Sequence, residues 1–372
     1  MDGATFLWFA AGLVLLVAGA ELLVRGASRL AGAFGISPLV IGLTVVAYGT
    51  STPELAVAVQ AGFDGRADLA VGNVVGSNVF NILFILGTCA AIAPLVVQAQ
   101  VVRREVPIMI GASLLAALLG IDGRYGMLDG ALLTAGIAFY SVSSIVQSRR
   151  ESKAVQEEYA HEFGAPAAGH GGGLAVQVAL IAVGLVLLIL GARWLVHSAV
   201  TVAQALGVSE VVIGLTIVAA GTSLPEVAAS LVATLRGERD IAIGNVIGSN
   251  IYNVLAILGI ASLVTPGGLS VAPSIQTFDG PVMIAVALAC LPLFFTGRRV
   301  ARWEGLLFLA YYFAYAAYLV LDAVGHDALP AYSAVMLEFT MPLTAITIAV
   351  VTFRELRAHR GGGGGPDPAS RA

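Results

Sequence analysis

The chain alternates long apolar runs with short polar breaks. Ten of the runs are about 17–25 residues long, enough to cross roughly 30 Å of hydrocarbon as helices. They form two groups of five, at 5–24, 39–62, 71–95, 105–122 and 127–147, and then at 174–196, 211–235, 243–264, 281–297 and 303–322. A further run, 332–353, contains Glu338 and Pro342 and predicts an eleventh span near the C-terminus. This pattern predicts an all-α polytopic membrane protein.

The composition supports that class. Of the 372 residues, 58% are hydrophobic and only 11% are charged, whereas soluble domains carry roughly 25% charged residues. The two cysteines, Cys89 and Cys290, lie inside apolar runs, so we expect core residues and no disulfide framework. The N-terminal MDGAT lacks the basic segment of a signal peptide, so the first apolar run is expected to be retained as a span.

Basic residues set the expected orientation, because cytoplasmic loops are enriched in Arg and Lys. With the N-terminus outside, the inward-facing loops and the C-terminal segment as far as Arg360 hold 15 basic residues, and the outward-facing loops hold 2, Arg66 and Arg124. We therefore expect an integral membrane protein with its N-terminus outside and its C-terminus in the cytoplasm. The basic inner loops and the lack of targeting signals favour a prokaryotic plasma membrane.

Residues 42–87 and 214–259 are two copies of one core sequence. At a constant offset of 172, 26 of the 46 aligned positions are identical. Five spans per copy is an odd number, so the second copy must enter the membrane from the opposite side. Inverted repeats with helices broken at the midplane are a recurring plan of secondary transporters. The predicted organisation is a first repeat at 1–147, a cytoplasmic linker at 148–173, a second repeat at 174–322, an extra span at 323–357 and a disordered tail at 358–372.

Each core copy places a carboxylate inside an apolar run, directly after a proline. Pro53 and Pro225 have no N–H, which leaves the carbonyl four residues earlier without its helical partner. Glu54 and Glu226 follow these breaks, and an ionisable residue inside a span is a functional-site hypothesis by default. Hydroxyl oxygens lie within one turn of each break, on Thr50, Ser51, Thr222 and Ser223. A single copy of this pattern could be a kinked span whose glutamate reaches water. Two equivalent copies favour a binding site instead.

The second part of each copy, GNVVGSNVFN or GNVIGSNIYN, carries a polar stripe. Its members recur at i, i+4 and i+8, which places them on one helical face; they are Asn73, Ser77 and Asn81, and then Asn245, Ser249 and Asn253. We expect site residues at Ser77, Asn81, Ser249 and Asn253. Asn78 and Asn250 are expected to pack helices through their amides, and the glycines to permit close helix approach.

Together these residues predict an all-oxygen site with a charge of −2. Calcium takes 6–8 oxygen ligands in flexible geometry, which suits this set better than the strict octahedron of magnesium. The two copies contain neither Cys nor His, which disfavours zinc and copper. The same two carboxylates could instead bind sodium ions or protons. The residues by themselves therefore do not decide which monovalent ion is exchanged for calcium.

The paired GTS-x-PE and GN-x-x-GSN-x-x-N signatures resemble the alpha repeats of the cation/calcium exchanger superfamily, and within it those of prokaryotic sodium/calcium exchangers. The resemblance covers about residues 5–322. It implies exchange of Ca²⁺ for Na⁺ by alternating access. The calcium ligands that it implies are Glu54, Glu226, Thr50 and Thr222. The sodium ligands that it implies are Ser51, Ser77, Ser223 and Ser249, with carbonyls near Ala47 and Ala219.

The chain departs from this family's pattern in two places. Some of the exchangers have an aspartate where Asn253 stands, whereas here both equivalent positions, Asn81 and Asn253, are asparagine. The number of coupled monovalent ions is therefore open, and a proton/calcium antiporter is an alternative. The eleventh span is additional to the ten-span plan of the family.

Other classes fit the sequence less well. An ATP-driven pump needs a nucleotide site with a lysine, but Lys153 is the only lysine and no Walker A motif is present. The chain has neither the H-E-x-x-H nor the G-x-S-x-G motif of an enzyme. A cation channel also uses carboxylates, but inverted repeats around one centre favour alternating access. We therefore expect no cofactor, ATP or nucleic acid, and expect Ca²⁺ and Na⁺ or H⁺ as transported substrates in a lipid bilayer.

Overall fold

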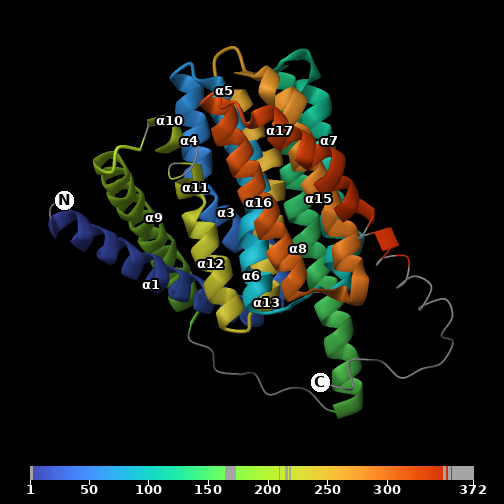
Figure 1. Ribbon diagram of the computed structural model, residues 1–372. Helices are drawn as coiled ribbons and strands as arrows, with labels where there is room; N and C mark the ends of the chain where they lie inside the picture. The colour runs from blue at the N-terminus through green and yellow to red at the C-terminus, as the bar shows by residue number, and fades with distance from the viewer. Residues whose placement is uncertain are drawn as a thin grey trace.

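A computed structural model shows an almost entirely helical molecule (Figure 1). It describes residues 3–163, 173–208, 210–213, 217, 219–346, 349–350 and 353. Within that part of the chain, nine helices are long and apolar enough to cross a membrane. A tenth is counted when the bent pair 38–50 and 52–63 is taken as one span. The prediction of a polytopic all-α protein is confirmed.

The described part of the first half contains eight α-helices, with short π-helical turns between several of them and one 3-10 turn, η4. They are α1 (Gly3–Phe34), α2 (Pro38–Ile41), η1 (Gly42–Val46), α3 (Ala47–Thr50), α4 (Thr52–Phe63), α5 (Ala67–Phe80), η2 (Asn81–Leu86), α6 (Gly87–Ile92), η3 (Val101–Glu105), α7 (Val106–Leu119), η4 (Gly120–Asp122) and α8 (Met127–Phe163).

The second half repeats this order. Its elements are α9 (Leu174–Ala205), α10 (Glu210–Ile213), α11 (Ala219–Thr222), α12 (Leu224–Leu235), α13 (Arg239–Tyr252), η6 (Asn253–Leu258), α14 (Gly259–Val264), η7 (Ile275–Asp279), α15 (Gly280–Phe295), η8 (Thr296–Arg298) and α16 (Arg302–Ala323). The chain continues through α17 (Leu329–Ala334) and η9 (Val335–Thr340). The bounds of α4, α5, η2 and α6 recur in α12, α13, η6 and α14 at the offset of 172 that aligns the sequence copies.

The helices differ from the apolar runs mainly at their ends. α8 continues through Phe163, so the first part of the segment predicted as a linker, 148–163, is helical. The rest of that segment, 164–172, and the predicted tail, 358–372, lie outside the described residues. The predicted span 211–235 is described except at 214–216 and 218. The last predicted span begins at Leu329, and its described helix runs to Ile346.

The long helices α1 and α9 lie side by side and antiparallel at one edge of the molecule (Figure 1). A Cβ built on Gly19 would lie 2.7 Å from the carbonyl oxygen of Gly184, and one built on Gly12 would lie 2.9 Å from that of Gly191. Gly12 and Gly184 are equivalent positions of the two copies, as are Gly19 and Gly191. The two helix backbones can therefore meet only because both helices carry glycine at these points.

Both core copies break their helix at the predicted place. Ser51 lies between α3 and α4 with φ −83° and ψ 8°, and Ser223 lies between α11 and α12 with φ −89° and ψ 8°. Pro53 and Pro225 follow in the first turn of the next helix, where a missing N–H costs least. The first pair of helix segments is bent by 44° at the break. The sequence prediction of broken helices is confirmed at both breaks.

In the part of the chain that the structure describes, four two-residue strands join the two halves. β1 (Leu95–Val96) pairs antiparallel with β4 (Arg299–Val300). β2 (Arg124–Tyr125) pairs antiparallel with β3 (Leu269–Ser270). Each pair connects a loop of the first half to a loop of the second half, so the halves are linked at both ends of the helix bundle.

The most deeply buried helix is α13, which crosses the centre of the molecule. Eleven of its residues are buried, including Asn245 and Ser249. Its glycines bring it close to the first copy: a Cβ on Gly248 would lie 2.5 Å from the carbonyl oxygen of Leu43, and one on Gly244 would lie 2.5 Å from that of Leu39. The polar stripe of the second copy is therefore held against the broken helix of the first.

Candidate cation-binding site

The two motif glutamates occupy the first turns of the helices that follow the breaks. Glu54 is in the first turn of α4, and Glu226 is in the first turn of α12. Each side chain has only 1% of its surface exposed. Neither carboxylate forms a salt bridge with a basic side chain of the described residues. Two buried carboxylates without a basic partner need a cation or protons for neutralisation.

Each glutamate accepts a hydrogen bond from the break serine of the other copy. Ser51 Oγ donates to Glu226 Oε1 at 2.7 Å, and Ser223 Oγ donates to Glu54 Oε1 at 3.0 Å. Ser223 Oγ also lies 3.3 Å from Ser77 Oγ on α5. These contacts bring five predicted site residues from both copies into one buried cluster.

The motif threonines reach across the two copies in the same way. Thr50 Oγ1 donates to Asn245 Oδ1 at 3.2 Å, and Thr222 Oγ1 donates to Asn73 Oδ1 at 3.4 Å. The Ala47 carbonyl accepts from the Ser51 amide at 3.0 Å and lies 3.3 Å from Thr50 Oγ1. The predicted Ala47 oxygen is thus at the break.

Several buried oxygens of the cluster have no hydrogen-bond partner among the residues that the structure describes. They are Glu54 Oε2, Glu226 Oε2, Asn81 Oδ1, Asn253 Oδ1 and Ser249 Oγ. Buried polar atoms are normally satisfied, so orphaned acceptors need an explanation. A hard cation supplies one, because carboxylate, amide and hydroxyl oxygens are its preferred ligands. The donor chemistry of these residues therefore fits calcium or sodium.

Asn78 packs helices together through its amide, as predicted, whereas the Asn250 amide bonds its own helix. Asn78 Nδ2 donates to the carbonyl of Asn250 at 3.3 Å, and Asn250 Nδ2 donates to the carbonyl of Val246 at 2.8 Å. Asn253 Nδ2 donates to Asn78 Oδ1 at 3.0 Å. Asn253 is therefore held by its nitrogen, and its oxygen has no hydrogen-bond partner within the described part of the chain.

Some residues at the cluster are not among the ligands that the sequence predicts. Asn73 and Asn245 belong to the predicted polar stripe, and they bond the threonines. Ser230 Oγ accepts from Asn245 Nδ2 at 2.9 Å. The i, i+4 spacing of Glu226 and Ser230 on α12 was the available signal for Ser230. Ala219, a predicted carbonyl ligand, is the first residue of α11, at the place that Ala47 has in α3.

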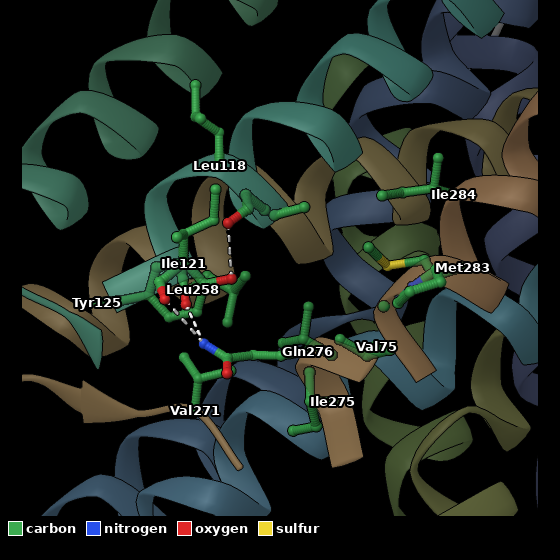
Figure 2. Close-up of a pocket in the computed structure, with 16 residues that line it drawn as sticks. Val75, Leu118, Ile121, Tyr125, Leu258, Val271, Ile275, Gln276, Met283 and Ile284 are labelled. Carbon is green, nitrogen blue, oxygen red and sulfur yellow. Dashed lines mark hydrogen bonds between the residues drawn. The ribbon is translucent and has the colours of Figure 1, made fainter. Parts of the chain in front are cut away.

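A separate apolar cavity of about 500 Å³ lies between α5, α7 and α15. Figure 2 shows Tyr125 and Gln276 as polar side chains at this cavity, with Gln276 Nε2 donating to the Gly120 carbonyl at 2.6 Å. Met283 on its wall contacts the site indirectly, because its sulfur accepts from Asn78 Nδ2 at 3.5 Å. None of the predicted site residues lines this cavity, so the oxygen cluster is a different place.

The sequence matches the family described as "Sodium/calcium exchanger protein" over residues 4–146 and 176–321. The chain belongs to this family. The match covers most of both halves of the chain. Members of the family are membrane transporters, so the predictions of an integral membrane transporter and against an enzyme are confirmed.

Individual relatives are similar over most of their length. The chain is 38% identical to the inner membrane protein YrbG of Escherichia coli over 277 residues, covering 74% of this chain and 84% of that protein. It is 33% identical to the sodium/calcium exchanger MaX1 of Methanosarcina acetivorans over 349 residues, covering 86% of this chain and 99% of that protein. A solved structure of the sodium-calcium exchanger NCX_Mj superposes with a TM-score of 0.73 at 31% identity, covering 86% of this chain and 100% of that chain.

Proposed function

We propose that this protein is a secondary active transporter that exchanges Ca²⁺ for Na⁺ by alternating access around Glu54 and Glu226. The observation that carries the proposal is the pair of crossed hydrogen bonds, Ser51 to Glu226 and Ser223 to Glu54. They make one site from two copies of the same motif. The relatives named sodium/calcium exchangers support the choice of ions.

Calcium binds between the two carboxylates and the hydroxyls of Thr50 and Thr222. Two carboxylates give the charge of −2 that one Ca²⁺ neutralises. Sodium ions use overlapping and neighbouring oxygens, which belong to Ser51, Ser77, Asn81, Ser223, Ser249 and Asn253 and to the carbonyls of Ala47 and Ala219. The orphaned oxygens of Glu54, Glu226, Asn81, Asn253 and Ser249 support this assignment.

Coupling follows from charge. An empty pair of carboxylates is costly to enclose in a low-dielectric interior, so only the loaded forms change their access. Calcium and sodium compete for the same oxygens, and each crossing therefore carries one kind of ion. The pair α1 and α9 is the moving element, since both helices are uninterrupted and repeat-related and lie at the edge of the bundle.

The two five-span copies are inverted in the membrane, and residues 323–357 add a peripheral span. The N-terminus lies outside and the C-terminus in the cytoplasm of a prokaryotic plasma membrane. The basic residues of the inner loops support this orientation. No cofactor is needed, because the transported ions carry the free energy of the process.

Proton/calcium exchange is the second candidate. Within the described residues no group of three or more His, Cys, Asp or Glu side chains is placed so that it could hold a metal ion. The cluster thus has only the two glutamates to carry charge, and both can also carry protons. With either counter-ion, calcium flux depends on an opposing gradient, which a channel does not require.

The deciding experiment is uptake of radioactive calcium into proteoliposomes. Vesicles loaded with sodium and diluted into sodium-free medium are expected to accumulate calcium, and potassium-loaded vesicles are not. Uptake driven by a pH gradient alone would replace sodium with protons in the proposal. Uptake that needs neither gradient would contradict exchange and favour a channel.

A further inference from the structure

The two halves of the oxygen cluster differ in the surroundings of their stripe asparagines. Asn245 is fully buried, and its Nδ2 donates to Ser230 Oγ at 2.9 Å and lies 3.4 Å from the backbone carbonyl oxygen of Glu226. Its Oδ1 faces Thr50, whose hydroxyl donates to it at 3.2 Å. Asn245 therefore joins a threonine of the first copy to the glutamate helix of the second.

These contacts fix the orientation of the Asn245 amide. The Glu226 carbonyl can only accept, and Ser230 Oγ accepts the shorter bond, so Nδ2 must point toward α12. The amide oxygen is then the atom presented to Thr50. A flipped amide would direct N–H groups at the Thr50 hydroxyl and occupy the lone pairs that a cation needs.

The equivalent asparagine of the first copy has no such support. Asn73 Oδ1 accepts from Thr222 Oγ1 at 3.4 Å, but Asn73 Nδ2 is buried without a hydrogen-bond partner among the described residues. The residue equivalent to Ser230 is Ala58, one turn after Glu54, which is 1% exposed and has no hydroxyl. At this position the two copies therefore differ by one hydroxyl group, which is present in Ser230 and absent from Ala58.

We propose that Ser230 and Asn245 are positioning residues that orient the Thr50 hydroxyl toward a bound cation. This inference rests on the proposed function. When a cation lies between Thr50 and the glutamates, the hydroxyl hydrogen needs an acceptor on the far side, and Asn245 Oδ1 is that acceptor. The Thr50 half of the site is preorganised by Ser230, whereas the Thr222 half must order its asparagine when the ion binds. Such ordering lowers affinity.

The test compares the calcium dependence of uptake in reconstituted wild type, Ser230→Ala and Ala58→Ser. Removing one neutral hydrogen bond at a buried site is expected to raise the KM for calcium about fivefold in Ser230→Ala, with unchanged maximal rate. By the repeat relation to Ser230 and Asn245, Ala58→Ser is expected to give Asn73 Nδ2 an acceptor and to lower KM, and the double variant is expected to return toward wild type. Ser113→Ala is the matched control, because that buried serine bonds its own helix through the Met109 carbonyl.

The outcomes separate this inference from the proposed function. If wild type takes up calcium but Ser230→Ala keeps the wild-type KM, the positioning role is wrong while exchange stands. A lowered thermal midpoint with unchanged KM would show a merely structural serine and would also overturn it. Should Ser230→Ala fail to fold, an unchanged KM in Ala58→Ser overturns the proposal. If wild type shows no gradient-driven uptake, the proposed function itself fails.

Discussion

Ser51 Oγ donates to Glu226 Oε1 at 2.7 Å across 175 positions of sequence. The reciprocal bond, from Ser223 to Glu54, spans 169 positions. Neither copy of the motif satisfies its own glutamate with its own break serine. Substitutions in one copy are therefore expected to change ion binding through the other copy as well.

Glu54→Gln and Glu226→Gln are each expected to abolish calcium uptake, a loss of at least about a hundredfold. The glutamine side chain has the size of glutamate and an oxygen that can accept a hydrogen bond from the opposite serine. It lacks the negative charge that offsets the ion's dehydration. Uptake in proteoliposomes measures the loss, and elution as a single detergent-solubilised species checks folding. Glu338→Gln is the control, since Glu338 lies exposed on the peripheral helix. Exchange retained in Glu54→Gln would contradict the assignment of this residue.

Acidification is expected to inhibit calcium uptake competitively. A protonated glutamate has no charge to offer calcium, so KM for calcium rises as the medium becomes more acidic, and saturating calcium restores the maximal rate. Initial rates over a matrix of calcium concentration and pH measure this. A fall in maximal rate at constant KM would instead place the titrating group outside the ion site.

The glycines between α1 and α9 are expected to tolerate no side chain. A Cβ at Gly19 would meet the Gly184 carbonyl at 2.7 Å, so Gly19→Ala must push the backbones apart, at a cost of about 1–3 kcal/mol. We expect a lower thermal midpoint and slower exchange. Gly32→Ala in the same helix is the control, because no described atom lies within 4 Å of a Cβ placed there. Equal midpoints for the two variants would argue against close packing at Gly19.

The β1–β4 pair offers a covalent test of the link between the halves. Val96 and Arg299 are register partners, and both are exposed. With Cys89 and Cys290 replaced by alanine, the double variant Val96→Cys/Arg299→Cys is expected to form a disulfide under mild oxidation. Cleavage at a protease site inserted in residues 164–172 should then leave the halves joined until reductant is added. Pairing of Val96→Cys with a cysteine at Ser270 is expected to fail, because Ser270 belongs to the other strand pair.

Much of this architecture could be predicted from sequence because its causes are local or repeated. Run length gave the spans, and Pro53 and Pro225 marked the helix breaks. The gapless repeat pointed to Glu54 and Glu226 as a pair. The two-residue strands were not predicted, since their partners are 144–205 positions apart and no alternating pattern can develop over two residues.

Ser230 was missed for a different physical reason. The candidate site residues are those that the two copies have in common. Ser230 is not one of them, because the equivalent residue of the first copy is Ala58. The spacing from Glu226 was the one signal for it in the sequence, and the contact to Asn245 places it at the cluster. The predicted ligand set is accordingly symmetric, whereas the hydrogen-bond network is not.

The crossed serine–glutamate bonds also bear on how the protein is made. When the ribosome has delivered Glu54 to the bilayer, the hydroxyl that bonds it lies 169 residues further along the chain. During that interval the nascent first half holds a carboxyl group without its eventual partner. Such a group is inserted most cheaply as the neutral acid. The carboxyl group of the first copy therefore meets its hydroxyl partner only after the second copy has been inserted, so the ion site is completed late in biogenesis.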